Sequence, residues 1–149
     1  AMAKAQMAAQ PPLPLEGNVF LSVKPEDKAR AVNIGRELVR LGYTIFSTAG
    51  TALVLEDNNI PVQRLFKLSE GARPNVLDML KNDEVALIIN TPSGQTPRVD
   101  ENVIRSEAVM RRVCIMTTIT GAEAALEGIK ALKDRPVEVR SIQEYSREL

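Results

Sequence analysis

The chain has 149 residues, 44% of them hydrophobic and 26% charged, so it is long enough to form one domain with a buried core. Nineteen basic and nineteen acidic residues cancel, which argues against nucleic acid or a membrane as a partner, and no apolar segment is long enough to span a bilayer. The absence of histidine excludes catalytic triads, imidazole catalysis and histidine metal sites, while a single cysteine excludes an intramolecular disulfide and a thiolate zinc site. The first residues show no signal-peptide pattern, which leads us to expect a cytoplasmic protein.

Residues 1–17 are expected to be a linker from a preceding domain, because an alanine-rich opening gives way to Pro11, Pro12 and Pro14. The chain then alternates short apolar runs, which predict buried strands, with segments of helical apolar spacing. Strands are predicted at 19–23, 43–47, 62–66, 85–89 and 113–116. Helices are predicted at 25–41, 50–58, 75–81, 101–111 and 121–132, followed by a short strand at 137–139 and a helical tail that Ser141 caps.

Several residues predict where these elements end or what they bury. Pro25 and Pro74 are expected in the first turns of their helices, where proline is tolerated, and Gly42 is expected to end the first helix. Cys114 is expected to be a buried apolar filler. Five strands that are apolar on both faces and alternate with five helices predict one α/β domain, residues 18–149, with a doubly wound parallel sheet between two layers of helices.

The loop after the second predicted strand is the first candidate site. Ligands of open parallel sheets bind beyond the carboxyl ends of the strands, so only the strand-to-helix loops need inspection. Here Thr48, Gly50 and Thr51 open a helix whose free backbone N–H groups and dipole attract an anion. The alternative is that the hydroxyls are ordinary N-caps.

A second candidate loop follows the fourth predicted strand. It offers an amide, hydroxyls and a glycine from Asn90, Thr91, Ser93 and Gly94, and the alternative is a plain turn. Lys28 lies in the first turn of a helix and Lys67 ends the third strand; each alone is expected to be solvated. If the lysines and the two loops converge, they match a phosphate monoester, which carries about −1.5 to −2 charges at neutral pH.

Other chemistry has less support. The chain has no Walker loop and no GxGxxG fingerprint, so nucleoside triphosphate and dinucleotide binding are not indicated. Adjacent acidic residues at 26–27, 83–84 and 100–101 do not face each other on a helix, and we interpret them as structural.

The chain contains five strings in a distinctive order: GNVFLSVKPEDK, LGYTIFSTAGTA, FKLSEGARPNVLDMLKN, ALIINTPSG and RSEAVMRRVCIMTTITGA. Together they resemble the C-terminal allosteric domain of carbamoyl-phosphate synthase large subunits, from about residue 17 to the end. The opening is similar to the segment that joins this domain to the preceding synthetase half. The resemblance implies the methylglyoxal-synthase-like fold, a three-layer α/β fold with strand order 3-2-1-4-5.

The resemblance implies a regulatory chain without catalytic residues, cofactor or metal of its own. The parent polypeptide is an ATP-dependent ligase that makes carbamoyl phosphate from bicarbonate, glutamine-derived ammonia and two ATP, for arginine and pyrimidine synthesis. ATP and a divalent metal bind in its catalytic domains. The implied partners are those domains, the small glutaminase subunit, an effector of the UMP, IMP or ornithine class, and a further copy of the chain.

Carried onto this sequence, the family's effector phosphate pocket consists of Lys28, Thr48, Gly50, Thr51, Lys67, Asn90, Thr91, Ser93 and Gly94. The sequence departs from the family elsewhere. Pro92 replaces a frequent threonine, residues 95–97 replace a basic stretch, Glu101 replaces a small polar residue, and the loop at 67–74 is one residue longer. The resemblance therefore extends to the phosphate site, and it does not define the specificity for base and ribose.

Three alternatives remain open. A methylglyoxal synthase would need a catalytic aspartate segment, where this chain has Gly71-Ala72-Arg73-Pro74, and a histidine, which it lacks. An IMP cyclohydrolase shares the LSV and STxGTA strings but diverges after Lys67. The third alternative is a structural oligomerisation module without a ligand.

Overall fold

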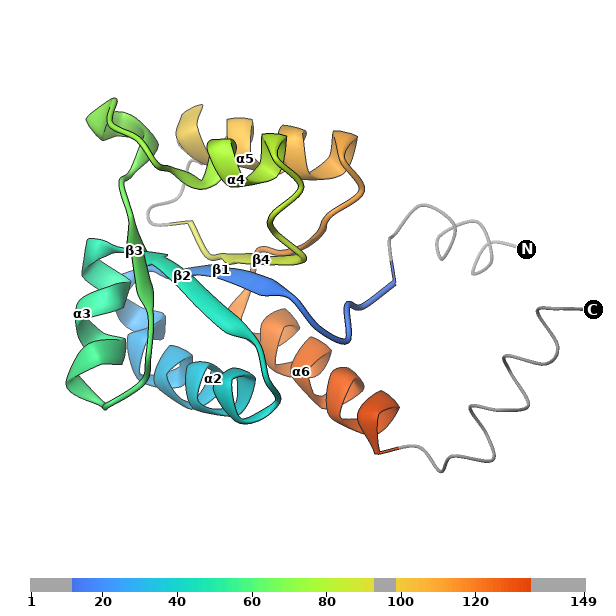
Figure 1. The fold of residues 1–149 in the computed structure, drawn as a ribbon. Helices are drawn as coiled ribbons and strands as arrows, with labels where there is room; N and C mark the ends of the chain where they lie inside the picture. Colours follow the sequence, from blue (N-terminus) through green and yellow to red (C-terminus); the bar gives the residue numbers. More distant parts are fainter. Residues whose placement is uncertain (1–11, 93–98, 135–149) are drawn as a thin grey trace, which may run out of the picture.

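The computed structural model describes residues 12–92 and 99–134, and Figure 1 shows a central sheet with helices on both sides. Within these residues, five parallel strands lie in the order β3-β2-β1-β4-β5, which confirms the expected topology. The strands are β1 (Asn18–Ser22), β2 (Thr44–Thr48), β3 (Gln63–Leu65), β4 (Leu87–Asn90) and β5 (Cys114–Met116). The α-helices are α2 (Lys28–Arg40), α3 (Ala49–Asp57), α4 (Val76–Lys81), α5 (Val99–Met110) and α6 (Ile119–Lys133), and two 3-10 turns are η1 (Pro25–Asp27) and η2 (Leu68–Glu70).

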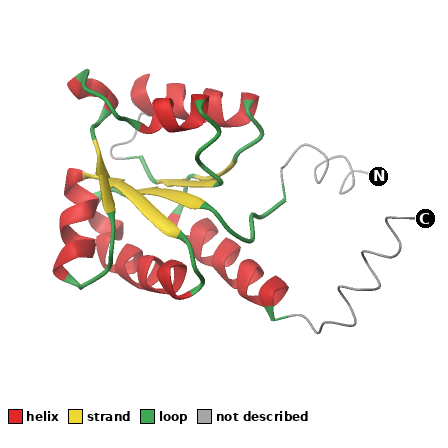
Figure 2. Cartoon of the chain, in the orientation of Figure 1, coloured by secondary structure: helices red, strands yellow, loops and turns green. Residues whose placement is uncertain are grey.

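The sheet separates two apolar cores, because successive side chains of a strand point to opposite faces. Val19 and Leu21 of β1 belong to the core beneath α2, α3 and α6, whereas Phe20 belongs to the core beneath α4 and α5. Figure 2 shows the strands enclosed between these two helical layers. The three-layer arrangement predicted from strands that are apolar on both faces is therefore confirmed.

The ends of the helices follow local sequence signals with one exception. Gly42 directly follows the C-cap of α2 and ends the helix as expected. Its φ is 99°, a backbone conformation that glycine adopts without strain. The prediction that Pro74 lies in the first turn of α4 is wrong. Asn75 is the N-cap, and its side-chain oxygen accepts the N–H groups of Leu77 at 3.0 Å and Asp78 at 3.2 Å, so Pro74 precedes the helix.

Residues 12–17, which we call the strap, pack against the amino-terminal edge of the sheet. The hydroxyl of Tyr43 donates to the carbonyl oxygen of Pro14 at 2.6 Å, and burial raises the pKa of Tyr43. Leu13 packs on the core, and its Cδ1 lies 3.0 Å from where a Cβ on Gly128 of α6 would be. This part of the expected linker is therefore in contact with the domain.

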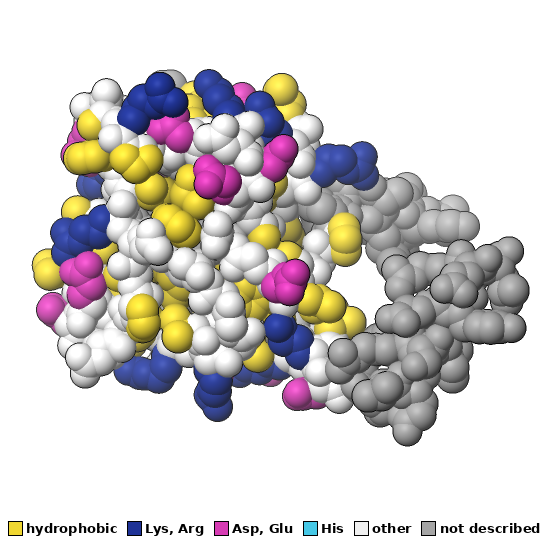
Figure 3. Space-filling view, viewed as in Figure 1, with side chains coloured by type: hydrophobic (Ala, Val, Ile, Leu, Met, Phe, Trp, Pro, Cys, Tyr) yellow, Lys and Arg dark blue, Asp and Glu magenta, His cyan; other side chains and the backbone are white. Residues whose placement is uncertain are grey.

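The described surface mixes charges of both signs. Figure 3 shows basic and acidic side chains interspersed over the visible face. None of the described helices is long and apolar enough to cross a membrane. The remainder of the expected linker, residues 1–11, and the expected strand at 137–139 and helical tail lie outside the described residues.

Candidate functional site

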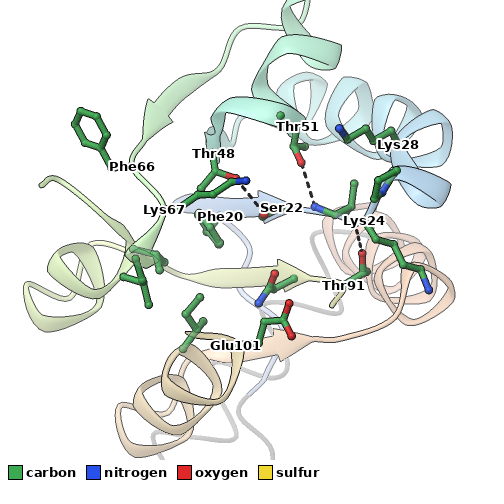
Figure 4. A pocket seen from close by; sticks show the side chains of 17 residues that line it. Phe20, Ser22, Lys24, Lys28, Thr48, Thr51, Phe66, Lys67, Thr91 and Glu101 are labelled. Atoms are coloured by element: carbon green, nitrogen blue, oxygen red, sulfur yellow. Dashed lines mark hydrogen bonds between the residues drawn. The ribbon is translucent and has the colours of Figure 1, made fainter. Parts of the chain in front are cut away.

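A pocket of about 450 Å³ opens at the carboxyl-terminal edge of the sheet, where the loops after β1, β2, β3 and β4 meet (Figure 4). Seven of the nine residues expected in an anion site line it: Lys28, Thr48, Gly50, Thr51, Lys67, Asn90 and Thr91. The other two, Ser93 and Gly94, lie outside the described residues. The structure thus brings together residues from the ends of strands and the starts of helices at one edge of the sheet, and their role in binding an anion stays a prediction.

The start of α3 forms one wall of this pocket. Thr48 occupies the N-cap position, but its side chain makes no capping hydrogen bond. Its hydroxyl instead lies 3.2 Å from the hydroxyl of Ser22, at the end of β1. The ordinary capping role that serine and threonine often have is therefore not the role of Thr48 here, and it leaves the first N–H groups of α3 without a side-chain cap.

The hydroxyls of Thr51 and Thr91 hold the backbone that follows β1. Thr51 Oγ1 accepts the N–H of Val23 at 3.1 Å, and Thr91 Oγ1 accepts the N–H of Lys24 at 2.9 Å. The dashed lines in Figure 4 show both bonds, one from the turn after β1 to α3 and one from the same turn to the loop after β4. Both threonines are almost fully buried, so these bonds satisfy backbone groups that would be costly to leave unpaired.

Three lysines and one glutamate are the charged residues among the described lining of the pocket. Lys28 lies beside the start of α3, where a Cβ added to Gly50 would be 3.3 Å from Lys28 Nζ. Lys67 extends toward Thr48 in Figure 4. Lys24 and Glu101 complete the set, so the lining carries an excess of positive charge. A positive, partly enclosed lining favours an anionic ligand.

The side of the pocket next to α4 and α5 is apolar. Phe20 and Ile104 are buried there, and Val76 of α4 adjoins them. Phe66 stands at the rim with 44% of its surface exposed. The pocket therefore has a cationic part and an apolar part, an arrangement that suits a ligand with an anionic group attached to a flat or apolar body.

The described residues offer binding groups but no obvious catalytic set. Cys114 is buried in β5 as an apolar filler, as expected, and burial raises the pKa of its thiol, so the thiol stays protonated. Across residues 12–92 and 99–134, no group of three or more acidic or thiol side chains is placed to hold a metal ion. The arrangement supports electrostatic and hydrogen-bonded capture of an anion.

Sequence reasoning missed Ser22, Lys24 and the apolar wall. Ser22 is the last residue of β1 and Lys24 lies just beyond it, so the rule that selected the other loops also applied to this one. Phe66 directly precedes Lys67, but nothing in the sequence indicated that it would stand at the rim of a cavity.

Comparisons with known proteins agree on a family and a fold. A family model described as "MGS-like domain" matches residues 30–117. The carbamoyl phosphate synthase large chain of Rhodopirellula baltica is 48% identical over 143 residues, which are 96% of this chain and 13% of that relative. The protein named "Carbamoyl phosphate synthase large chain, C-terminal section" from Methanocaldococcus jannaschii is 42% identical over 141 residues, 95% of this chain and 23% of that relative. The chain thus spans a small part of these relatives.

A solved structure shares the fold. The crystal structure of methylglyoxal synthase from Elizabethkingia anophelis superposes with a TM-score of 0.62, covering 76% of this chain and 79% of that one. The sequence identity is 15%, so this likeness concerns the fold alone.

Proposed function

This chain belongs to the MGS-like domain family, and we propose that it is the effector-binding regulatory domain of a carbamoyl phosphate synthase large chain. The effector is a small molecule with a phosphate group, and it binds in the pocket at the carboxyl-terminal edge of the sheet. The chain itself catalyses nothing in this proposal. Catalysis, ATP and the divalent metal belong to other domains of the parent polypeptide.

The observation that carries the proposal is the convergence of Lys28, Lys67 and the start of α3 on one pocket. A phosphate monoester brings about two negative charges and three acceptor oxygens. The two ammonium groups supply the countercharge, and the N–H groups that Thr48 leaves uncapped supply donors along the helix axis. Thr48 itself adds a hydroxyl, and Asn90 adds an amide at the neighbouring loop.

The apolar wall supports a nucleoside monophosphate rather than free phosphate as the effector. Phe20, Val76 and Ile104 form a surface on which a flat base packs while its phosphate remains near Lys28 and Lys67. UMP and IMP both have this shape and charge. Ornithine, which is cationic at its side chain, is less well matched to a lining with three lysines.

Regulation requires that the effector bind one state of the parent more tightly than the other. Typical coupling between two sites is about 1–3 kcal/mol. Two or three charge-assisted hydrogen bonds of roughly 1.5–3 kcal/mol each supply this difference if they form in one state only. The partners that receive the signal are the catalytic domains of the parent, with its glutaminase subunit and a second copy of the chain as further contacts.

Calorimetric titration of the 149-residue chain with UMP, IMP and inorganic phosphate tests the proposal. We expect at least one nucleotide to bind, and Lys28→Ala to weaken it. Lys81→Ala is the matched control, because it removes the same charge from the exposed last turn of α4, outside the pocket. If neither nucleotide gives a heat of binding and phosphate does not raise the melting temperature, the proposal is refuted and the oligomerisation module is favoured.

The enzyme alternative has its own assay. The chain is incubated with dihydroxyacetone phosphate and methylglyoxal is measured colorimetrically. We expect none, because the sequence has no histidine to serve as an acid–base partner. Turnover above that of a Lys67→Ala control would overturn the regulatory assignment.

A further inference from the structure

The turn between β1 and η1, residues 22–25, is held in place by two other segments of the chain. β1 ends at Ser22, so the next two backbone N–H groups take acceptors from side chains. Val23 donates to Thr51, which lies in the first turn of α3, and Lys24 donates to Thr91, which belongs to the loop after β4. The turn is thus bonded to the start of α3 and to the loop after β4, and both line the pocket.

Each of the two threonine hydroxyls still has a proton to give. A hydroxyl has one donor and two acceptor positions, and accepting a backbone N–H uses only an acceptor position. Thr51 and Thr91 are 3% and 4% exposed, and both line the pocket. Because both residues line the pocket, an oxyanion there can accept these protons, and doing so makes each oxygen a stronger acceptor for its backbone N–H.

We propose that the turn at residues 22–25 is the element that registers the bound oxyanion, with Thr51 and Thr91 as its positioning residues. This proposal rests on the proposed anion site. When the oxyanion accepts the two hydroxyl protons, the bonds to Val23 and Lys24 tighten, and the turn is drawn toward the start of α3 and the loop after β4.

The turn is well placed to pass this change onward. It leads through η1 directly into α2, and α2 packs on the core that α3 and α6 share. Thr91 also donates its own N–H to the carbonyl oxygen of Ser22 at 3.1 Å, so the loop after β4 grips the turn at two points. Tightening at the turn therefore changes the position of the first residue of α2, Lys28, relative to the sheet.

NMR of the labelled chain during a titration with inorganic phosphate tests the proposal, alongside calorimetry of the same samples. In the wild type we expect the amide resonances of Val23 and Lys24 to shift with the calorimetric binding curve. In Thr91→Val the Lys24 shift is lost, the Val23 shift is kept, and phosphate binds about tenfold more weakly. In Thr51→Val the pattern of the two amides is reversed.

Two further variants separate positioning from other effects. Thr91→Ser keeps the hydroxyl and restores the Lys24 shift, whereas Thr44→Val makes the same change at an exposed residue at the far end of β2 and alters neither amide. Hydrogen exchange at Lys24 in the phosphate-free protein becomes about tenfold faster in Thr91→Val than in the wild type.

The outcomes distinguish this proposal from the proposed function. If phosphate binds without shifts at Val23 and Lys24, the proposal that the turn at residues 22–25 registers the oxyanion is wrong, while the proposed anion site is still supported. Loss of affinity in Thr91→Val with an unchanged Lys24 amide shows Thr91 to be a plain ligand, which also overturns the proposal. No binding of phosphate or nucleotide to the wild type overturns both.

Discussion

Gly50→Ala is expected to stabilise the domain and weaken anion binding at the same time. Gly50 is the second residue of α3 and does not have a positive φ, so alanine fits its backbone. Alanine in a helix is favoured over glycine by about 0.5–1 kcal/mol, which raises the melting temperature of a chain of this size by about 1–4 °C. The new methyl lies 3.3 Å from Lys28 Nζ, and the lysine is flexible enough to yield at little cost.

The same methyl adds bulk to the pocket lining at the start of α3, between the helix and the Lys28 ammonium group that we expect to hold the oxyanion. Loss of one charge-assisted hydrogen bond costs roughly 1.5–3 kcal/mol, so affinity for inorganic phosphate should fall about ten- to hundredfold. Differential scanning calorimetry gives the stability, and isothermal titration gives the affinity. Leu53→Ala, at an exposed position of the same helix, should leave the affinity unchanged. If Gly50→Ala binds phosphate as tightly as the wild type, the start of α3 is not the anion seat.

Three further predictions concern the pocket, the strap and the core. Lys67→Ala should weaken nucleotide or phosphate binding at least about fivefold and change the free energy of unfolding by less than about 0.5 kcal/mol. The Lys81→Ala control should change the free energy of unfolding by a similarly small amount, and unfolding of Lys67→Ala would show a structural role instead. In urea unfolding, Leu13→Ala should lower the free energy of unfolding by about 1–2 kcal/mol and Leu15→Ala, at a 46% exposed position, by less than about 0.5; equal effects would mean that the strap is not docked. The Cys114 thiol should resist a thiol reagent until the chain unfolds, and because its pKa is raised in the folded state, stability should decline as pH rises above the ordinary thiol range, a decline that Cys114→Ala should lack.

The alternation of apolar runs and helical segments was enough to predict the fold, because the central strands β1 and β4 are buried on both faces. In β1, Val19, Phe20 and Leu21 are all buried although they point to two different cores. Such a run has no polar alternation, which is typical of a parallel sheet. Sheet order came from the resemblance, since no local pattern in the sequence determines which strands are neighbours.

The candidate site was predictable where it depended on strand ends, and unpredictable where it depended on contacts between loops. Thr48 is the last residue of β2 and Lys67 follows β3, so the rule for parallel sheets selected them. The bond from Lys24 to Thr91 joins residues 67 positions apart, and it exists because β1 and β4 are neighbours in the sheet. The N-cap role considered for Thr48 was equally plausible from the sequence, and only the position of Ser22 shows why its hydroxyl turns elsewhere.

The strap gives the domain a fixed mechanical entry point. Tyr43 is hydrogen-bonded to Pro14 at the amino-terminal edge of the sheet, and Leu13 packs against α6. A force applied to the chain ahead of residue 12 therefore acts on these two contacts before it acts on β1. A polypeptide joined there would therefore be held close to β2 and α6 through these contacts. A gene fusion that cuts the chain at residue 18 would discard this coupling and leave Tyr43 without its carbonyl partner, whereas a cut at residue 12 would retain both.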